Sequence, residues 1–236
     1  GKWLPVRVPT AHKGSFGHLL IVAGALGKTG AALLCGSGGL RSGAGLVTLC
    51  VPYELNNIIE SGLWEAMTVP LQSAAQGILS IEDYTVIKDA LQGKQALVVG
   101  PGIGTAEETA ELIEKLYCEV ETPILVDADG LNILAADTTL LKKASGPRIL
   151  TPHPGEMARL TGLTTSAIQK NRIEVTREFA KKHHVHIVLK GADTLVCDPE
   201  GNMAINPTGN PGMAAGGMGD VLAGLIGGFL AQGLSP

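Results

Sequence analysis

Aromatic residues are scarce in this sequence of 236 residues, since phenylalanine, tryptophan and tyrosine together make up only 3% of it. Basic residues are not in excess either, because 18 lysines and arginines stand against 22 aspartates and glutamates, for a formal net charge of -4. Surfaces that bind nucleic acids carry basic patches, often with aromatic side chains on which bases stack. The sequence therefore argues against a nucleic-acid partner.

Closely spaced cysteines are also absent. The four cysteines, Cys35, Cys50, Cys118 and Cys197, lie far apart and form no Cys-x-x-Cys pair. No histidine pair accompanies them at the spacing of a zinc site, and nothing in their pattern indicates a disulfide framework. We therefore expect four reduced thiols in the core.

The sequence has no hydrophobic run long enough to cross a membrane. Its longest apolar stretch, residues 221–231, falls well short of the roughly 20 residues that a spanning helix needs. The opening Gly-Lys-Trp-Leu-Pro lacks the apolar centre of a signal peptide. We expect a cytoplasmic protein with no membrane partner.

Glycine, in contrast, is abundant. It accounts for 32 of the 236 residues, about twice its usual share of roughly 7%, and it allows close backbone approach. Together with 45% apolar residues, the length suits one α/β domain with a sizeable core. We predict a single domain over residues 1–236, in which the proline-containing residues 1–17 form a linker laid over the domain, neither strand nor helix.

Short continuous apolar runs alternate with longer helical patterns along the chain. Such runs are typical of strands buried on both faces of a parallel sheet, and the segments between them then cover those faces as helices. The expected strands include residues 18–23, 46–51, 96–99 and 185–190, and the expected helices include residues 29–40, 81–91, 106–117 and 166–184. The predicted fold class is α/β, a sandwich with helices on both faces of a mostly parallel central sheet.

The most informative stretch is the glycine-rich run of residues 207–220, which leads into the apolar helix expected over residues 221–230. Gly216, Gly217 and Gly219 let backbone N–H groups converge, and the first turn of a helix adds unpaired donors and the positive end of its dipole. The stretch therefore predicts an anion site. Asp220 is either a cap of this helix or a general base beside the anion, and the stretch alone leaves both interpretations open.

Two nucleotide-binding motifs are incomplete in this sequence. Residues 27–29, Gly-Lys-Thr, are no P-loop, because Val22 stands where the first glycine of that motif belongs. Residues 100–104, Gly-Pro-Gly-Ile-Gly, follow an expected strand, but Thr105 replaces the third glycine of the dinucleotide fingerprint. Neither motif by itself predicts a site.

Polar residues follow several expected strands, and ligands of open α/β sheets bind beyond such strand ends. Asp127 and Asp129 follow one strand, His153 lies between two prolines after the next, and Lys190 ends a third. Each also has a structural interpretation: a helix cap for Asp129, a satisfied polar group for His153, and a solvated lysine in a hairpin turn for Lys190. Residues 42–45 equally suit a plain helix-to-strand connection.

Five motifs in one order resemble those of the NAD(P)H-hydrate dehydratases, a family of the ribokinase-like superfamily. They are residues 12–17 (His-Lys-Gly-Ser-Phe-Gly), 41–47 (Arg-Ser-Gly-Ala-Gly-Leu-Val), 100–104, 151–156 (Thr-Pro-His-Pro-Gly-Glu), and the glycine-rich loop that runs into Asp-Val-Leu-Ala-Gly. The resemblance covers essentially the whole chain and implies a ribokinase-like three-layer sandwich. His153 stands where sugar kinases of that superfamily carry asparagine, which argues against a sugar kinase.

The resemblance also implies roles for individual residues. Asp220 becomes the catalytic base, beside an anion hole formed by Gly216, Gly217 and Gly219. The residues implied to contact the substrate are Ala44, Gly102, Gly104, His153 and Asp220. Those implied to line the nucleotide site are Lys190, Gly191, Ala192, Asp193, Thr194 and Gly219, and Glu156 is implied to join a metal and water network indirectly.

The reaction that the resemblance implies is the repair of hydrated NADH or NADPH. ADP, in preference to ATP, phosphorylates the ring hydroxyl with Mg²⁺ present, and phosphate then leaves. The implied partners are the hydrated cofactor, the adenine nucleotide and further copies of the chain in a homotetramer. Further C-terminal helices and a fused epimerase domain are expected in the longer protein. A ribokinase-like kinase of a vitamin precursor alcohol and a noncatalytic nucleotide-binding module are the alternatives.

Overall fold

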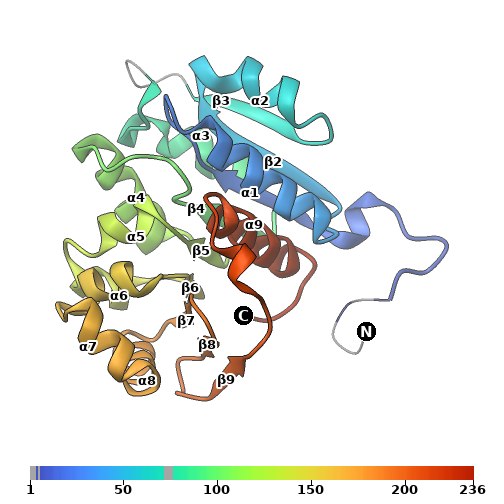
Figure 1. Cartoon of the computed structure of the whole chain (residues 1–236). Helices are drawn as coiled ribbons and strands as arrows, with labels where there is room; N and C mark the ends of the chain where they lie inside the picture. The colour runs from blue at the N-terminus through green and yellow to red at the C-terminus, as the bar shows by residue number, and fades with distance from the viewer. Residues whose placement is uncertain (1–3, 5, 72–76) are drawn as a thin grey trace.

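The computed structural model describes residues 4, 6–71 and 77–236, and its strands form one nine-stranded sheet (Figure 1). The strands are β1 (His18–Val22), β2 (Leu46–Pro52), β3 (Met67–Leu71), β4 (Ala96–Val99), β5 (Ile124–Val126), β6 (Arg148–Leu150), β7 (His186–Leu189), β8 (Thr194–Cys197) and β9 (Met203–Asn206). The strand runs expected from apolar continuity are confirmed to within one or two residues at their ends.

Helices fill most of the connections between these strands. The α-helices are α1 (Thr29–Arg41), α2 (Asn56–Gly62), α3 (Tyr84–Leu91), α4 (Glu107–Glu119), α5 (Asp129–Leu134), α6 (Pro154–Thr161), α7 (Thr165–Lys170), α8 (Arg172–His183) and α9 (Met218–Ala231). Short 3-10 turns are η1 (Lys13–Phe16), η2 (Tyr53–Leu55), η4 (Ile81–Asp83), η5 (Thr138–Lys143) and η6 (Pro211–Met213).

The sheet is mostly parallel, as predicted. Its strand order is β3-β2-β1-β4-β5-β6-β7-β8-β9, in which the pairs from β3 to β7 are parallel and the last two pairs are antiparallel. The register places Leu19 of β1 beside Val47 of β2 and Ala96 of β4. Because the parallel strands share one direction, the loops after β1, β4, β5, β6 and β7 all emerge at the same edge of the sheet.

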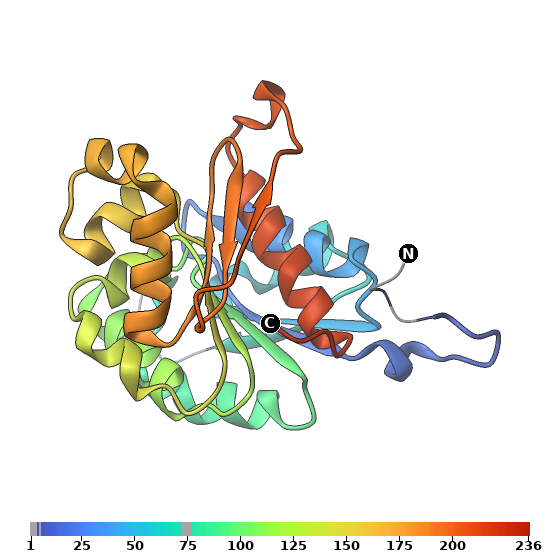
Figure 2. The ribbon, with the colours of Figure 1, turned by 90° about the horizontal axis from the view of Figure 1, so that it is seen from below.

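Helices cover both faces of this sheet and confirm the three-layer sandwich (Figure 2). One apolar core joins side chains of α1, α2 and α9 to one face of the sheet. The other core joins α3, α4, α5, α6, α7 and α8 to the opposite face. Since successive residues of a strand point to opposite faces, strands such as β4 contribute to both cores, which explains their continuous apolar sequence.

Small residues allow α1 and α9 to pack closely. A Cβ atom on Gly224 would overlap the carbonyl oxygen of Cys35, and one on Gly38 would overlap that of Val221. Any larger side chain at either glycine would push the two helices apart. The glycine content therefore fixes the position of α9, whose first turn carries the stretch singled out in the sequence.

Two expectations about helices are wrong. The single helix predicted over residues 166–184 is two helices, α7 and α8, which are separated at Asn171 with φ −132° and ψ 38°. Asparagine favours such breaks because its side chain competes for backbone hydrogen bonds. The linker of residues 1–17 contains a short helix after all, since His12 accepts a hydrogen bond from Gly14 N and caps η1.

The cysteine expectation is confirmed. All four thiols are free; Cys35, Cys50 and Cys197 are buried and Cys118 is half-buried. Within residues 4, 6–71 and 77–236, no helix has the length and apolar character needed to cross a membrane.

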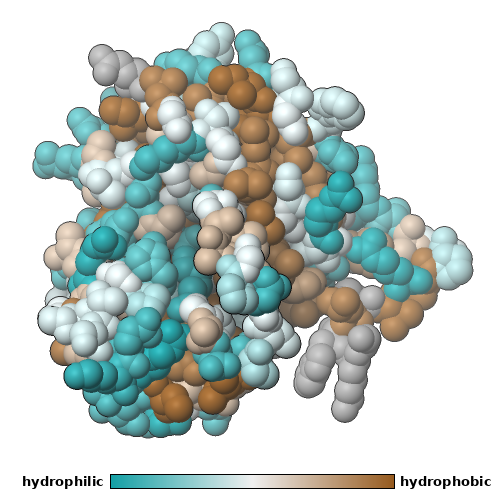
Figure 3. Space-filling model, viewed as in Figure 1, coloured by the Kyte–Doolittle hydropathy of each residue, from teal (hydrophilic) through white to brown (hydrophobic). Residues whose placement is uncertain are grey.

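A band of apolar surface crosses the face formed by α1, α2 and the start of α9 (Figure 3). The exposed apolar side chains of these helices are those of Leu34 on α1, Ile58 on α2 and Met218 on α9. Most of the hydrophilic surface in this view, drawn in teal, lies on either side of the band.

Candidate active site

The residues singled out in the sequence gather mainly at the edge of the sheet where the parallel strands end. Asp127 follows β5, Thr151 follows β6, and Lys190 follows β7. The first turn of α9, with Gly219 and Asp220, lies beside them. This is the edge at which open α/β sheets bind their ligands.

Asp127 and Lys190 form the centre of the site. Asp127 Oδ1 lies 2.7 Å from Lys190 Nζ and accepts a hydrogen bond of 2.7 Å from Thr151 Oγ1. The Asp127 side chain is 2% exposed and that of Lys190 is 19% exposed. The solvated lysine expected in a hairpin turn is therefore wrong for the side chain, although the turn between β7 and β8 is confirmed.

Glu156 brings a second carboxylate to the same ammonium group. Its Oε2 atom lies 3.6 Å from Lys190 Nζ and accepts a hydrogen bond of 2.7 Å from the backbone N–H of His153. The ring of His153 completes a capping box at the start of α6, because Nδ1 accepts from the N–H groups of Gly155 and Glu156. His153 is thus a satisfied polar group, as one of its interpretations held, and it is also a helix cap, which the sequence did not predict. Half of its side chain remains exposed to solvent.

The first turn of α9 holds Asp220 without capping the helix. The helix begins after Gly217, which has φ +87°, and no side chain donates or accepts a capping hydrogen bond there. Asp220 is the third residue of the helix, and no hydrogen bond or ion pair engages its carboxylate among the described residues. The interpretation of Asp220 as a helix cap is therefore wrong, and its oxygens are available to a ligand.

The surroundings of Asp220 favour its protonated form. Burial raises the pKa of this carboxyl above its ordinary value, and the negative charges of Asp127 and Asp129 act in the same direction, while Lys190 opposes them. A carboxylate with a raised pKa is a stronger base than an ordinary aspartate. Beneath it, burial together with Asp127 and Asp220 raises the pKa of the Cys35 thiol well above its usual range, so this cysteine stays an inert core residue.

Gly219 faces the ion pair at close range. A Cβ atom at this position would lie 3.5 Å from Lys190 Nζ and 3.6 Å from Asp127 Oδ2, whereas one at Gly216 would meet nothing within 4 Å. Gly217, in contrast, has its Cβ direction filled by Leu34. Backbone at residues 216 and 219 can therefore approach a ligand directly, as an anion-binding loop requires.

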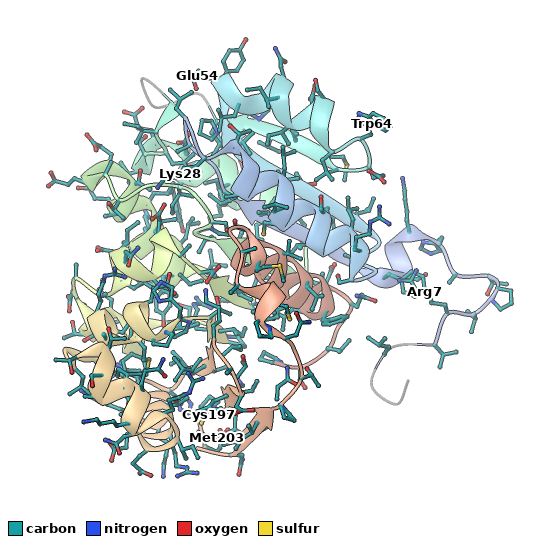
Figure 4. All side chains as sticks on the ribbon, viewed as in Figure 1. Arg7, Lys28, Glu54, Trp64, Cys197 and Met203 are labelled. Atoms are coloured by element: carbon teal, nitrogen blue, oxygen red, sulfur yellow. The ribbon has the colours of Figure 1, made fainter. Side chains whose placement is uncertain are left out.

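Asp129 lies beside this centre and binds two neighbouring loops. Its Oδ2 atom accepts from Gly104 N at 2.9 Å and from Lys28 Nζ at 2.8 Å. Lys28, which is labelled in Figure 4, immediately precedes α1. No side chain caps α5, so the interpretation of Asp129 as a helix cap is wrong. The residue between the two aspartates, Ala128, has φ +50° and ψ −119°, a backbone conformation that costs about 1–3 kcal/mol in a residue with a side chain and is concentrated at functional sites.

The glycines expected to contact the substrate differ in their surroundings. Gly102 is buried, with its Cβ direction facing Ala31 and Lys28. Gly104 has φ +79° and opens onto free space. Both lie in the loop after β4 at the ligand-binding edge, so Gly104 is the more accessible of the two.

Ala44 lies apart from the other expected site residues. It is 8% exposed and lies two residues before β2, at the edge where the parallel strands begin. The structure therefore does not bring Ala44 to the site within one chain. Residues 42–45 instead make the plain helix-to-strand connection, in which Gly45 N donates to Phe16 O at 3.0 Å.

The segment expected to line the nucleotide forms the turn from β7 into β8. Gly191 has φ +134° and Asp193 has φ +52°, and Thr194 Oγ1 donates to Gly191 O at 2.8 Å, which stabilises the turn. Ala192 and Asp193 line an open depression of about 540 Å³ with residues 169–174, Leu195 and Ile205. Lys190 thus points to the central carboxylates, while Ala192 and Asp193 face this depression.

The acidic oxygens suit a magnesium ion that arrives with a nucleotide. Among residues 4, 6–71 and 77–236, no three His, Cys, Asp or Glu side chains converge to hold a metal by themselves. Mg²⁺ in nucleotide enzymes is held by one or two carboxylates together with phosphates and water. Asp127 Oδ2 fits that arrangement, because Lys190 engages the other oxygen of this carboxylate. Glu156 Oε1 lies 3.5 Å from His153 Nε2 and Oε2 faces Lys190, so Glu156 suits an indirect role in such a site.

Sequence reasoning assigned no role to Thr151 or Lys28 and left Asp127 without one. A signal existed for Asp127 and Thr151, since both follow buried strands at the ligand-binding edge. Lys28 carried no such signal, because the P-loop pattern around it is incomplete and its partner Asp129 lies 101 residues away.

Comparison with known proteins places this chain in a family. Residues 19–236 match the family described as Carb_kinase, NAD(P)H-hydrate dehydratase. A bifunctional NAD(P)H-hydrate repair enzyme of Moorella thermoacetica is 44% identical over 233 residues, which are 99% of this chain and 44% of that protein. The chain therefore spans less than half the length of this curated relative.

Solved structures agree with this assignment. A Bacillus subtilis ADP/ATP-dependent NAD(P)H-hydrate dehydratase, co-crystallised with ATP/Mg²⁺, has a TM-score of 0.81 at 35% identity over 98% of this chain and 78% of that one. A ribokinase-like superfamily protein of Enterococcus faecalis has a TM-score of 0.81 at 25% identity over 97% and 76%, which confirms the predicted fold class. The chain belongs to the NAD(P)H-hydrate dehydratase family.

Proposed function

We propose that this protein converts hydrated NADH and NADPH back to NADH and NADPH at the expense of an adenine nucleotide. The observation that carries the proposal is the carboxylate of Asp220, which has a raised pKa and no partner in the described chain. It stands in the first turn of α9, beside the Lys190–Asp127 ion pair and the open backbone of residues 216 and 219. A base next to an anion-binding loop is the arrangement that phosphoryl transfer to a hydroxyl group requires.

The reaction divides into phosphorylation and elimination. Asp220 takes the proton of the ring hydroxyl, whose oxygen then bonds to the terminal phosphorus of the nucleotide while the bridging oxygen–phosphorus bond breaks. Phosphate next leaves the ring with the bonding electrons, assisted by the lone pair of the ring nitrogen, and the neighbouring ring carbon loses a proton. The hydroxyl group thus departs as phosphate, which is a far better leaving group than hydroxide.

The remaining groups position the reactants and neutralise charge. N–H groups of residues 216–219 and the start of α9 would face the transferred phosphoryl group, and Lys190 would supply the nearby positive charge. Magnesium, held by Asp127 Oδ2 and indirectly by Glu156, would neutralise phosphate charge when it is bound with the nucleotide.

The two substrates then approach the centre from different sides. We assign the hydrated cofactor to the loop of Gly102 and Gly104 and to the exposed part of His153. We assign the nucleotide to residues 190–194, where Ala192 and Asp193 open onto the depression beside α8. ADP is the proposed donor in preference to ATP, in keeping with the name of a 36% identical Bacillus subtilis relative, ADP-dependent (S)-NAD(P)H-hydrate dehydratase.

We further propose that copies of the chain associate, as a homotetramer. The apolar band over α1, α2 and α9 supports association, because exposed apolar faces of this kind mark protein interfaces. Sedimentation equilibrium tests this proposal, and a monomer at micromolar concentration would contradict it. The cytoplasmic location and the fused epimerase domain expected from the sequence stay predictions.

The decisive experiment follows the recovery of dihydropyridine absorbance from hydrated NADH. We expect recovery with ADP or ATP in the presence of Mg²⁺, and none without nucleotide or after chelation. Hydroxyethylthiazole serves as the competing substrate, since ribokinase-like kinases include enzymes for such alcohols. Phosphorylation of that alcohol without recovery of NADH would replace the proposed function with that of a vitamin kinase, and loss of neither substrate would favour a noncatalytic module.

A further inference from the structure

Three loops of the ligand-binding edge meet at one carboxylate oxygen. Asp129 Oδ2 accepts a hydrogen bond of 2.9 Å from the backbone N–H of Gly104 and lies 2.8 Å from the ammonium group of Lys28. Gly104 belongs to the loop after β4, Lys28 to the loop after β1, and Asp129 to the start of α5 after β5. Gly104 precedes Asp129 by 25 residues and Lys28 precedes it by 101.

The geometry around this oxygen is held under strain. Ala128, which directs Asp127 to Lys190 and Asp129 to Gly104, has the unfavourable combination of φ +50° and ψ −119°. Strained backbone persists only where its surroundings hold it in place. Backbone hydrogen bonds from Leu131 and Asn132 to the Ala128 carbonyl hold this turn together with the side-chain bonds of Asp127 and Asp129. The Asp129 bond links the turn to the loop of Gly104.

The loop that Asp129 holds is accessible to a ligand. Gly104 has φ +79°, and a Cβ atom there would meet nothing within 4 Å, so its outer side is open. The side chain of Asp129 is 19% exposed, and two donors occupy one of its oxygens. Asp129 thus holds the loop through the Gly104 amide, while the Cβ direction of Gly104 stays open.

We propose that Asp129 is a positioning residue for the hydrated cofactor, which holds the loop of Gly104 in its binding shape with Lys28 as the charge partner. This inference rests on the proposed function for the identity of the ligand. A carboxylate is needed because one oxygen serves two donors and balances a positive charge. Asparagine offers an oxygen to Gly104 N but leaves Lys28 without a counter-charge, and alanine offers neither.

Binding and kinetics of four variants test the inference: Asp129→Ala, Asp129→Asn, Lys28→Met, and Asp137→Ala as a matched control. Asp137 is likewise a carboxylate that accepts from a backbone N–H at the start of a short helix, at Thr139, but it is exposed and outside the site. We expect Asp129→Ala to raise the KM and Kd for hydrated NADH about tenfold, the effect of losing one charge-assisted hydrogen bond. The Kd for ADP should stay within about twofold of the wild-type value. Asp129→Asn and Lys28→Met should show smaller losses of affinity for hydrated NADH.

Hydrogen exchange at the Gly104 amide provides a readout that needs no turnover. In Asp129→Ala the protection of this amide should fall, in Asp129→Asn it should be largely kept, and in Asp137→Ala it should be unchanged. Equal losses of affinity for ADP and hydrated NADH, or unchanged protection in Asp129→Ala, would overturn the inference. If Asp129→Ala fails to fold, Lys28→Met and Asp129→Asn test the inference instead, through the loss of affinity for hydrated NADH relative to that for ADP.

The test separates this inference from the proposed function. A wild-type chain that does not turn over hydrated NADH would refute the proposed function, while Kd values and amide exchange would still decide on Asp129. If the wild-type chain turns over hydrated NADH but Asp129→Ala leaves KM and Kd unchanged, only the inference about Asp129 falls.

Discussion

Replacement of Asp220 by asparagine tests the proposed mechanism at its centre. The substitution is nearly isosteric, and no hydrogen bond or ion pair of the described chain involves the carboxylate, so it breaks no contact of the fold. It does remove the proton acceptor and one negative charge. Asparagine cannot accept the hydroxyl proton, and removal of a general base slows catalysis by about 10² to 10⁴, or roughly 3 to 5 kcal/mol in the activation barrier.

Stability should move in the opposite direction from activity. Because the pKa of Asp220 is raised in the folded state, its protonated form stabilises the fold at low pH, and that contribution is lost as the pH rises through the raised pKa. At neutral pH the ionised Asp220 therefore lowers the free energy of unfolding. We expect Asp220→Asn to melt at a higher temperature than the wild type at pH 7, and this gap should narrow as the pH falls toward the ordinary aspartate pKa of about 3.9.

The assay combines turnover, binding and melting on the same protein preparations. Turnover of hydrated NADH with ADP and Mg²⁺ gives kcat, and calorimetric titration gives the Kd for ADP, which should stay the same or tighten as a negative charge near phosphate disappears. Near-normal turnover in a folded Asp220→Asn variant would refute the role of Asp220 as base. A lower melting temperature at pH 7 would refute the reasoning from its raised pKa.

The remaining predictions concern the loop, the cap and the ion pair. Gly219→Ala should fold normally, because its Cβ would lie at an ordinary contact distance of 3.5 Å from Lys190 Nζ, but its methyl group should weaken nucleotide binding. Gly224→Ala should lower the melting temperature strongly, because its Cβ would overlap a backbone carbonyl of α1. A lower melting temperature for Gly219→Ala than for Gly224→Ala would contradict this account of the packing. His153→Asn should keep the melting temperature, since asparagine is a good helix cap, while the KM for hydrated NADH rises; an unchanged KM would leave His153 a cap only. Lys190→Ala should weaken ADP binding much more than binding of hydrated NADH. It should also lower the melting temperature, because Asp127 is left buried without its ion pair. Equal losses of affinity for the two ligands, measured by calorimetric titration, would remove the lysine from the nucleotide site.

The sequence by itself determined most of the elements and the class of fold. Continuous apolar runs placed the strands, because a strand covered on both faces has no polar side, and the helical patterns between them required the three layers. The glycine-rich loop before α9 and the polar residues after β5, β6 and β7 also followed from sequence, since parallel strands deliver their following loops to one edge. The position of the candidate site in the fold could therefore be predicted from these short sequence patterns.

Only the tertiary structure decided which side chains meet there and which interpretation of each holds. Lys190 and Asp127 are 63 residues apart, and their ion pair exists because β5, β6 and β7 lie side by side in the sheet. Asp220 proved free of a capping role, and Ala44 proved to lie at the opposite edge. Helix capping, burial and ion pairing depend on where other segments of the chain pack. The contact between α1 and α9 that fixes the position of Asp220 joins helices that are far apart in the sequence. No local sequence pattern could therefore encode the surroundings of Asp220.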